Sequence, residues 1–311
     1  MELRDLRVLI GIAEAGSMSA AARHLNLTQP ALSSALRRLE DELNVRLVRR
    51  HSRGADLSEE GRFVLQKAYE IFHEVAEISS VVVNLSEEPI GNVRLGLPTT
   101  VAGGLIPQLV PLIRAHHPRI NLHVIEAMSG SLAELLQVGK IDLAVLYDVQ
   151  PMAGLKSEPL LKERLALLTH PRHPLAKKAT VRLDDVAQVN LVLPSAVHTL
   201  RQHIDKVCRA EGVALTVVAD IDSLPGMIGL AQTGLATILP VFLFQEEIER
   251  GQLVAINIVR PEIEWTVQLA SRLDARRPRA TLATSRLLKV VCAGMVEKGR
   301  WPGEIAVRGK L

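Results

Sequence analysis

Aromatic side chains are scarce in this chain. They make up 3% of its 311 residues, with two tryptophans, two tyrosines and four phenylalanines scattered along it. Proteins that bind single-stranded nucleic acid without sequence preference stack the bases on aromatic side chains. So few scattered aromatics cannot build such a platform, and a nucleic acid partner would therefore be duplex.

Cysteines and long apolar runs are scarce as well. Cys208 and Cys292 match neither a metal-ligand spacing nor a disulfide framework, and we interpret them as small buried hydrophobic residues. No uncharged apolar run approaches the roughly 18 to 20 residues that cross a bilayer, and acidic residues interrupt the N-terminal apolar stretch. The sequence therefore predicts a soluble, cytoplasmic protein with no membrane partner.

Motifs for catalysis and for metal binding are also missing. The chain has no GxSxG, P-loop or GxGxxG pattern, and nothing places a nucleophile beside a base. Its histidine pairs lack an HExxH arrangement or a carboxylate at metal-ligand spacing. We therefore expect no enzyme activity, no metal site and no cofactor. The pairs are His116 and His117, His170 and His173, and His198 and His203.

The chain does contain enough apolar side chains for a large core. Hydrophobic residues make up 48% and charged residues 23%, which excludes a disordered protein, and 311 residues correspond to about two domains. The net charge is only +3, but the arginines are unevenly placed. No lysine precedes Lys67, and one short stretch holds Arg37, Arg38, Arg46, Arg49, Arg50 and Arg53.

The first sixty residues predict three short helices. Apolar residues recur at helical spacing from Leu3 onward until Gly16 ends the run, and Ser17 can cap a second, alanine-rich helix. Thr28 can cap a third helix, which tolerates Pro30 in its first turn. Four leucines spaced by four, three and four residues form the expected buried stripe of the third helix: Leu32, Leu36, Leu39 and Leu43.

The opposite face of the third helix carries the chemistry of a major-groove reader. Glutamine can pair with an adenine edge, arginine with guanine or a phosphate, and serine is short and adaptable. For this helix alone, an ordinary amphipathic helix with a polar solvent face explains the pattern about equally well. The side chains on that face are Gln29, Ser33, Ser34 and Arg37.

The residues that follow favour the DNA-binding interpretation. Residues 47–50 and 55–57 suit two short strands, and 52–54 supply a turn between them. Arg53 at the tip of such a wing can reach a minor groove, whose negative potential attracts arginine. The sequence therefore predicts a winged helix-turn-helix over residues 1–58.

A long helix is expected next, over residues 59–88, with Ser58 as its cap. Its apolar residues step by four and three, which is a heptad seam on a rod roughly 42 Å long. Packing of this helix against its own domain is the alternative. We favour dimerisation, because two recognition helices would then face two half-sites on successive turns of the duplex. The seam consists of Val64, Ala68, Ile71, Val75, Ile78 and Val82.

From residue 92 onward, expected strands and helices alternate. This rhythm predicts a mainly parallel α/β sheet that is covered on both faces, and it repeats after about residue 164, so that two halves form a cleft. Residues 87–91 contain proline and glycine and break the preceding helix. We therefore place the boundary of the C-terminal domain, residues 89–311, at this hinge.

The run AARHLNLTQPALSSALRRLEDELNVRLVRRHSRGADLSEEGR resembles the DNA-binding segment of LysR-type transcriptional regulators, and the resemblance extends over the whole chain. GLPTTVAGGLIPQL, DSLPGM and LVLPS resemble most the subgroup of the nitrogen assimilation control (Nac) regulator. The resemblance implies an α/β regulatory domain like type 2 periplasmic binding proteins, with two α/β subdomains. Subdomain I would span about 91–163 and 266–300, and subdomain II about 164–265.

The resemblance also implies base and groove contacts from the recognition helix and a backbone or minor-groove contact from the wing. The residues that the resemblance implies and the arginines of the arginine-rich stretch together make one set of candidate DNA-binding residues. That set is Thr28, Gln29, Pro30, Ser33, Ser34, Arg37, Arg38, Arg50 and Arg53.

Hydroxyl side chains recur where expected strands lead into helices of the C-terminal domain. Unpaired N–H groups at such helix starts can hold an anion, although each of these residues alone is more readily explained as a cap. Their recurrence at equivalent strand ends favours an effector site. Tyr147, Phe242 and Phe244 are the candidates to stack on an aromatic effector. The candidate effector-binding residues are Thr99, Thr100, Ser129, Gly130, Ser131, Tyr147, Ser195, His198, Thr199 and Ser223.

These features predict a LysR-type regulator that binds an interrupted inverted repeat in promoter DNA. It would act as a homodimer or homotetramer, respond to a small-molecule effector in its cleft, and have RNA polymerase as a further partner. An alternative is a solute-binding module whose N-terminal domain serves protein assembly. An unrecognised enzyme is disfavoured by the missing catalytic groups.

Overall fold

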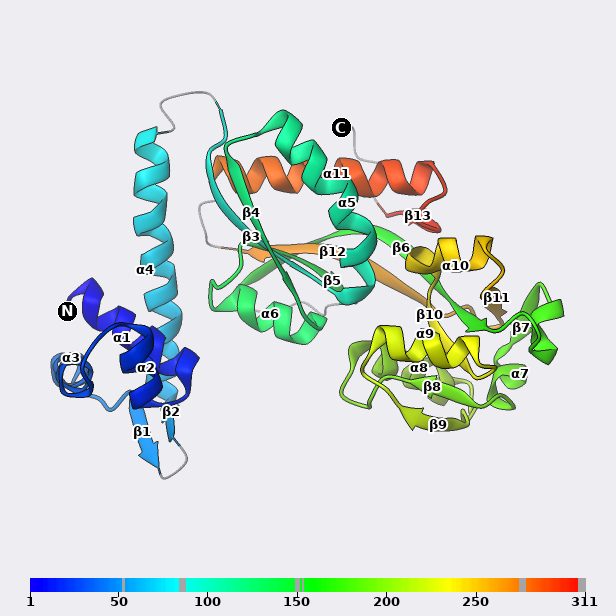
Figure 1. Ribbon diagram of the computed structural model, residues 1–311, viewed down its shortest axis with the longest axis horizontal. Helices are drawn as coiled ribbons and strands as arrows, with labels where there is room; N and C mark the ends of the chain where they lie inside the picture. The colour runs from blue at the N-terminus through cyan, green and yellow to red at the C-terminus, as the bar shows by residue number, and fades with distance from the viewer. Residues whose placement is uncertain (52–53, 84–87, 149–151, 153, 274–277, 307–311) are drawn as a thin grey trace. The chain divides into compact units, whose positions relative to one another are not determined.

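The computed structural model divides the chain into two compact units (Figure 1). We call Met1–Glu88 the head, and Pro89–Leu136 together with Ile141–Leu311 the body. The description covers residues 1–51, 54–83, 88–148, 152, 154–273 and 278–306, with the backbone alone for 70, 73–74 and 76–83. Within these residues, no helix is both long and apolar enough to cross a membrane.

The head contains the three predicted short helices, α1 (Leu3–Ala15), α2 (Met18–His24) and α3 (Gln29–Leu43). Gly16 ends α1 in the left-handed conformation, with φ of 63°. The Ser17 hydroxyl accepts a hydrogen bond from Ala20 N at 3.2 Å, and the Thr28 hydroxyl accepts one from Ala31 N at 3.3 Å. The predicted caps and helix ends are thus confirmed.

The predicted wing is an antiparallel hairpin of β1 (Val48–His51) and β2 (Gly54–Leu57). The buried Glu40 on α3 holds its base, because this carboxylate accepts Leu47 N at 2.8 Å and Val48 N at 3.2 Å. Leu43 departs from the predicted stripe of α3. It is 36% exposed, since the buried stripe ends one turn earlier.

The long helix α4 (Glu59–Val83) follows, and the Ser58 hydroxyl accepts Gly61 N at 2.9 Å as its predicted cap. Ala68 is fully buried in the core of the head, and Val64 and Ile71 pack against the same core. Val75 lies beyond that contact and is 39% exposed. The side chains of Ile78 and Val82, the last two residues of the predicted seam, lie outside the described residues.

The body is built on one 11-stranded sheet, in which two long strands connect two lobes (Figure 1). These crossover strands, β6 (Leu155–Thr169) and β12 (Glu264–Arg272), pair with each other in antiparallel register. The first lobe adds the parallel strands β3 (Gly91–Leu97), β4 (Ile120–Glu126) and β5 (Leu143–Tyr147). The sheet is therefore parallel within this lobe and antiparallel where the chain crosses over.

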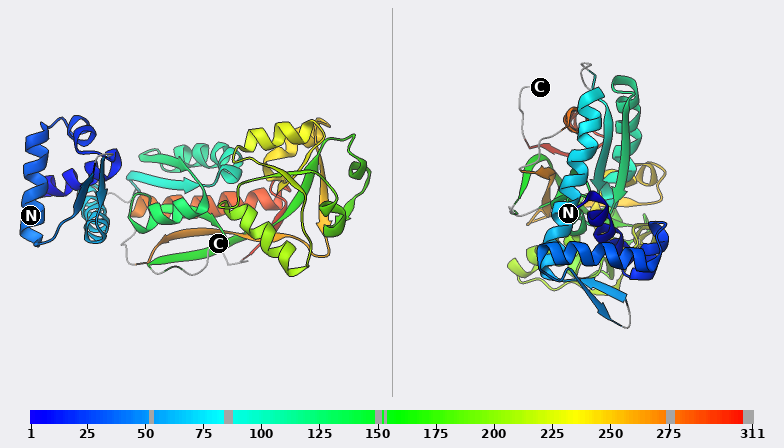
Figure 2. Two further views of the ribbon diagram at one scale, coloured as in Figure 1. Left: turned by 90° about the horizontal axis from the view of Figure 1, so that it is seen from below. Right: turned by 90° about the vertical axis from the view of Figure 1, so that its left-hand side faces the viewer.

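Helices cover both faces of the first lobe. Helices α5 (Thr99–His116) and α11 (Arg279–Glu297) pack against each other on one face (Figures 1 and 2). Helix α6 (Ser129–Gln137) covers the other face. Alternate residues of β5 explain this arrangement, because Val145 joins the core under α5 and α11 whereas Ala144 and Leu146 join the smaller core under α6.

The second lobe holds the remaining elements around β8 and its parallel neighbours. Several of its short elements were not expected from the sequence. Its strands are β7 (Thr180–Arg182), β8 (Leu191–Leu193), β9 (Val217–Asp220), β10 (Ala236–Pro240) and β11 (Val254–Val259). Its helices are η1 (Pro174–Lys177), α7 (Leu183–Ala187), α8 (Thr199–Ala210), α9 (Leu224–Gln232), η2 (Val241–Phe244) and α10 (Gln245–Glu249). Near the C-terminus, the short strand β13 (Gly303–Ile305) pairs with β6.

The close approach of α5 to η2 predicts a sharp difference between two helix-interior glycines. A Cβ at Gly104 would lie 2.7 Å from Cε1 of Phe242 and closer still to Cζ, whereas a Cβ at Gly294 on α11 meets nothing within 4 Å. Gly104→Ala should lower the unfolding free energy of the body by about 1 to 3 kcal/mol through overpacking. Gly294→Ala, the matched control, should raise it by about 0.4 to 1 kcal/mol. Urea unfolding of both variants checks this, and equal effects would contradict the packing described.

Candidate nucleic-acid interface and regulatory site

The N-terminal half of α3 presents a polar face at the surface of the head. Thr28, Gln29, Pro30 and Ser34 are exposed, and Ser33 is half-buried beside them. The face is held rigidly from behind, because Leu32, Leu36 and Leu39 on the other side of the helix are buried. Such a helix can present short and amide side chains to base edges without first having to order itself.

The arginines of this region divide into two kinds. Arg38 donates to the buried carboxylate of Asp5 on α1 at 2.7 Å, so it ties α3 to α1. Arg46 likewise donates to the buried Glu40 at 3.0 Å. Arg37, one residue before Arg38 on the helix that carries Gln29, is exposed. Arg38 and Arg46 are exposed too, but each of them also neutralises a buried carboxylate.

The wing adds positive charge beside this helix. Arg49 and Arg50 are exposed on β1, which carries a single buried residue, Val48. The predicted tip residue, Arg53, lies outside the described residues. Exposed guanidinium groups on a hairpin next to a polar helix can bind phosphates and so position the helix in a groove.

In the first lobe of the body, three predicted effector residues meet in one cluster. The Thr100 and Tyr147 hydroxyls lie 3.0 Å apart, and the Ser129 hydroxyl accepts Tyr147 N at 3.2 Å. Thr99, Gly130 and Ser131 are exposed neighbours on the first turns of α5 and α6. The N-termini of two helices therefore meet the carboxyl end of β5, as expected from the alternating pattern.

In the second lobe, the predicted residues act as caps. The His198 Nδ1 accepts Leu200 N at 3.1 Å at the start of α8, and the Ser223 hydroxyl accepts Gly226 N at 3.2 Å at the start of α9. Ser195 N donates to Asp222 at 2.9 Å, and Thr199 begins α8 half-buried. Burial lowers the pKa of His198, although the nearby Asp222 acts in the opposite direction.

A contact between an aspartate and a histidine, which sequence reasoning missed, joins the two lobes. Asp148 follows β5 in the first lobe, and its carboxylate lies 3.0 Å from Nδ1 of His203 on α8. Burial raises the pKa of Asp148, but hydrogen bonds from His203 and Thr266 N lower it more, so the net pKa is below its usual value. The first turns of α8 therefore face the Tyr147 cluster. No local spacing joins Asp148 to His203, because they lie far apart in the sequence.

A second missed group is a buried carboxylate at the crossover. Glu163 on β6 accepts hydrogen bonds from the Nε1 atoms of both tryptophans, Trp265 on β12 at 2.6 Å and Trp301 at 2.5 Å. Tyr147 stacks on Trp265 with ring centroids 3.7 Å apart, and Phe242 stacks on Trp301 at 4.1 Å.

These stacks change the interpretation of the aromatic residues. Tyr147, Phe242 and Phe244 are buried, and the rings of Tyr147 and Phe242 already face a tryptophan. They are part of the core of the body and do not offer a free stacking surface for an effector. Among the described residues, no group of three or more His, Cys, Asp or Glu side chains could hold a metal ion.

Two family descriptions match most of the chain. Residues 3–62 match the bacterial regulatory helix-turn-helix protein, lysR family, and residues 86–293 match the LysR substrate binding domain. The first match covers α1 through the wing, and the second covers almost all of the body.

Full-length relatives show the same domain order. The chain is 31% identical to the nitrogen assimilation regulatory protein nac of Klebsiella aerogenes over 96% of this chain and 97% of that protein. It is 29% identical to the HTH-type transcriptional regulator BbuR of Bordetella bronchiseptica, covering 98% and 94% of the two chains. The Nac match agrees with the subgroup predicted from the sequence.

Solved structures share the fold. A full-length OxyR variant from Pseudomonas aeruginosa aligns with a TM-score of 0.73 at 21% identity, covering 100% of this chain and 99% of that one. Full-length CbnR in complex with its target DNA aligns with a TM-score of 0.55 at 20% identity, covering 94% and 100%. The combination of a winged helix-turn-helix, a long helix and a two-lobed α/β domain is therefore common to all three chains.

The two kinds of arginine predict different outcomes for neighbouring substitutions. Arg38→Ala removes the ion-pair partner of the buried Asp5 and should lower the unfolding free energy of the head by about 1 to 3 kcal/mol. Arg37→Ala, its matched control, should change it by no more than about 0.5 kcal/mol and should weaken binding to any duplex. Denaturant unfolding and duplex titration check both, and a loss of stability in Arg37→Ala alone would contradict this assignment.

Proposed function

Since the chain belongs to the LysR family of bacterial transcriptional regulators, we propose that it binds an interrupted inverted repeat in promoter DNA as a homodimer or homotetramer. A small-molecule effector bound in the body would change how the two heads engage the repeat, and with it the contacts made to RNA polymerase. The protein would act in the cytoplasm, where this DNA is found.

The observation that carries the DNA-binding proposal is the exposed N-terminal face of α3. It presents Gln29 and Ser34 on a helix whose other side is locked into the core by Leu32 and Leu36. Arg49 and Arg50 on the adjacent hairpin supply positive charge for the phosphates. A solute-binding module that used its head for assembly alone would not need this arrangement.

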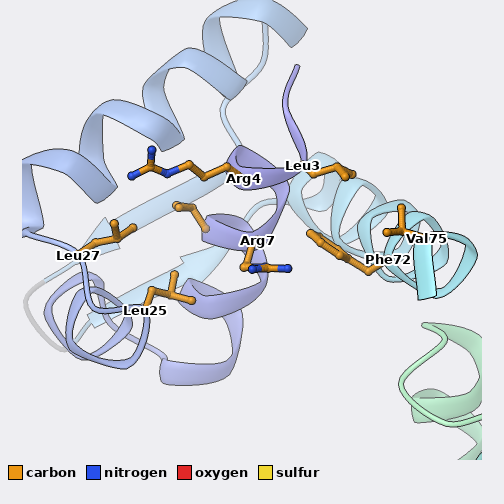
Figure 3. Close-up of a pocket in the computed structure, with 8 residues that line it drawn as sticks. Leu3, Arg4, Arg7, Leu25, Leu27, Phe72 and Val75 are labelled. Carbon is orange, nitrogen blue, oxygen red and sulfur yellow. The ribbon is translucent and has the colours of Figure 1, made fainter. Parts of the chain in front are cut away.

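A groove on the head supports self-association (Figure 3). Its volume is about 440 Å³, and apolar side chains of α1 and α4 line it, including Leu3, Phe72 and Val75. Arg4 and Arg7 of α1 lie along it, and the guanidinium of Arg7 sits 5.1 Å from the centre of the Phe72 ring. A second copy of α4 fits this surface, because its apolar seam could pack against the apolar lining of the groove, between Arg4 and Arg7.

The half of the seam near Ala68 packs within its own head, so the association would use the part from Val75 onward.

For the effector, we propose a site where α5, β5 and α8 meet. Thr100 and Tyr147 already touch there, and the Asp148–His203 pair brings α8 of the second lobe to the same place. Hydroxyls and helix N-termini at that point suit a small polar molecule. Tyr147 would contribute its hydroxyl, because its ring is stacked on Trp265.

Gln29→Ala tests base reading by α3. If Gln29 reads a base edge, the variant should lose about 1 to 3 kcal/mol of discrimination at one base pair per half-site and keep its affinity for random duplex. The measurement is a set of binding isotherms on duplexes that differ from the preferred site at single base pairs. Asp41→Ala, an exposed change at the other end of α3, serves as the control with unchanged discrimination. Equal losses on specific and random duplex would remove Gln29 from the reading face.

Val75→Lys tests the groove on the head. A buried ammonium group beside Arg4 and Arg7 would find only like charge there, so the variant should weaken self-association at least about tenfold, which corresponds to 1.4 kcal/mol. Sedimentation equilibrium without DNA measures this directly. Val290→Lys on α11, an exposed valine of the body, is the matched control and should keep the wild-type assembly. If both variants assemble like the wild type, the groove is not the contact surface.

A further inference from the structure

A buried carboxylate occupies the crossover of the body, and no cation pairs with it within the part of the chain that the structure describes. Glu163 is 1% exposed, and each of its oxygens accepts one indole N–H, from Trp265 and from Trp301. The Tyr147 hydroxyl also hydrogen-bonds to it. These three donors are neutral, so they stabilise a negative charge only in part.

Three separate parts of the chain meet at this carboxylate. Glu163 lies on β6, Trp265 on β12, and Trp301 in the C-terminal segment, which we define as residues 298–306. Trp301 is fully buried, and two residues later Gly303 pairs with Glu163 itself in the β13–β6 register. The hydrogen bonds of Glu163 therefore hold the C-terminal segment against both strands that connect the lobes.

The charged residues nearby lie on the opposite face of the strands. Lys162 and Arg164 alternate with Glu163 along β6, so they point away from it. Arg164 is bonded there to Glu262 and Glu264 and lies 3.6 Å from Glu304, the partner of Lys162 in the β13–β6 register. Only the two indoles and Tyr147 are thus placed, among the described residues, to stabilise the negative charge of Glu163.

Two titratable groups on the buried side, Tyr147 and Cys292, stay neutral near pH 7. Burial raises the pKa of Tyr147 well above its usual value, and the charge of Glu163 adds to this. Helix α11 packs on β6 and contributes Cys292, whose pKa burial raises to about 12. Its Lys289 is paired with Glu158 at 2.7 Å. On the side of α8, His203 lies with its ring 6.1 Å from that of Trp265 and contacts Asp148, so it adjoins one of the two indoles that donate to Glu163.

Burial raises the pKa of Glu163 to about 7, because the cost of removing its charge from water exceeds what the three donors return. Exposed to water, the same carboxyl would have a pKa near 4.5. The closed arrangement therefore binds the proton more tightly than one in which the segment has opened. By linkage, opening becomes easier as the pH rises from 4.5 to 7 and does not change further above that window.

We propose that Glu163 is a proton-binding site and that its proton holds the C-terminal segment closed on the two crossover strands. Loss of the proton favours release of Trp301 and loosens the joint between the lobes. Because Tyr147 interacts with both Glu163 and Thr100, protonation of Glu163 also affects the residues proposed to bind the effector. The body would thus respond to pH near neutrality independently of any effector.

The two tryptophans provide a direct test, since the chain contains no others. In the full-length protein labelled with ¹⁵N-tryptophan, both indole N–H resonances should shift between about pH 5.5 and 8.5 with one common midpoint near 7. Resonances that stay fixed, or that titrate with separate midpoints, would overturn the proposal. The experiment needs neither DNA nor effector, so its failure would leave the proposed function standing.

Hydrogen exchange measures the closing itself. Corrected for intrinsic rates, exchange of the β13 amides should increase roughly tenfold between about pH 6 and 8, as linkage predicts for a carboxyl whose pKa falls from 7 to 4.5 on opening. Glu163→Gln should abolish this dependence, and Glu158→Gln, on the same strand but paired with Lys289, should retain it. If Glu163→Gln fails to fold, the pH dependence of amide exchange in the wild-type protein is sufficient to test the proposal. A flat wild-type profile would contradict the proposal.

Discussion

The hydrogen bonds that Glu163 accepts from both indoles are the interaction on which the body depends. They join β6, β12 and the C-terminal segment at the place where the chain passes between its lobes. Few aromatic residues are available in this sequence, and four of them, Tyr147, Phe242, Trp265 and Trp301, are stacked in pairs around this point. Half of the eight aromatic side chains are therefore concentrated at one structural joint.

Buried acids have a comparable role in the head. Asp5 receives Arg38 and Glu40 receives Arg46, and Glu40 also accepts two backbone N–H groups at the base of the wing. These contacts fix the angles between α1, α3 and the hairpin. Two arginines of a cluster that looks uniform in the sequence are thereby used in folding. Arg37 and Arg50 are exposed on the same part of the head, and we propose that they bind the phosphates of DNA.

Local signals were sufficient for most of the fold. Ser17, Thr28 and Ser58 cap their helices as the sequence indicates, because capping depends on neighbours three residues away. The candidate site was less predictable. Asp148 and His203 are 55 positions apart, and Glu163 and Trp301 are 138 apart, so no local spacing reveals either contact. The seam of α4 was ambiguous for another reason, since the same spacing serves packing within the head and packing between copies.

We propose that the exposed face of α3 reads duplex DNA in a symmetric pair of copies. Selection of bound duplexes from a random library by the full-length protein distinguishes this arrangement from others. We expect an enriched, interrupted inverted repeat whose half-sites lie about 10 base pairs apart, or a multiple of that, with affinity falling steeply as salt rises. Enrichment of no sequence, or of a single unrepeated motif, would contradict it.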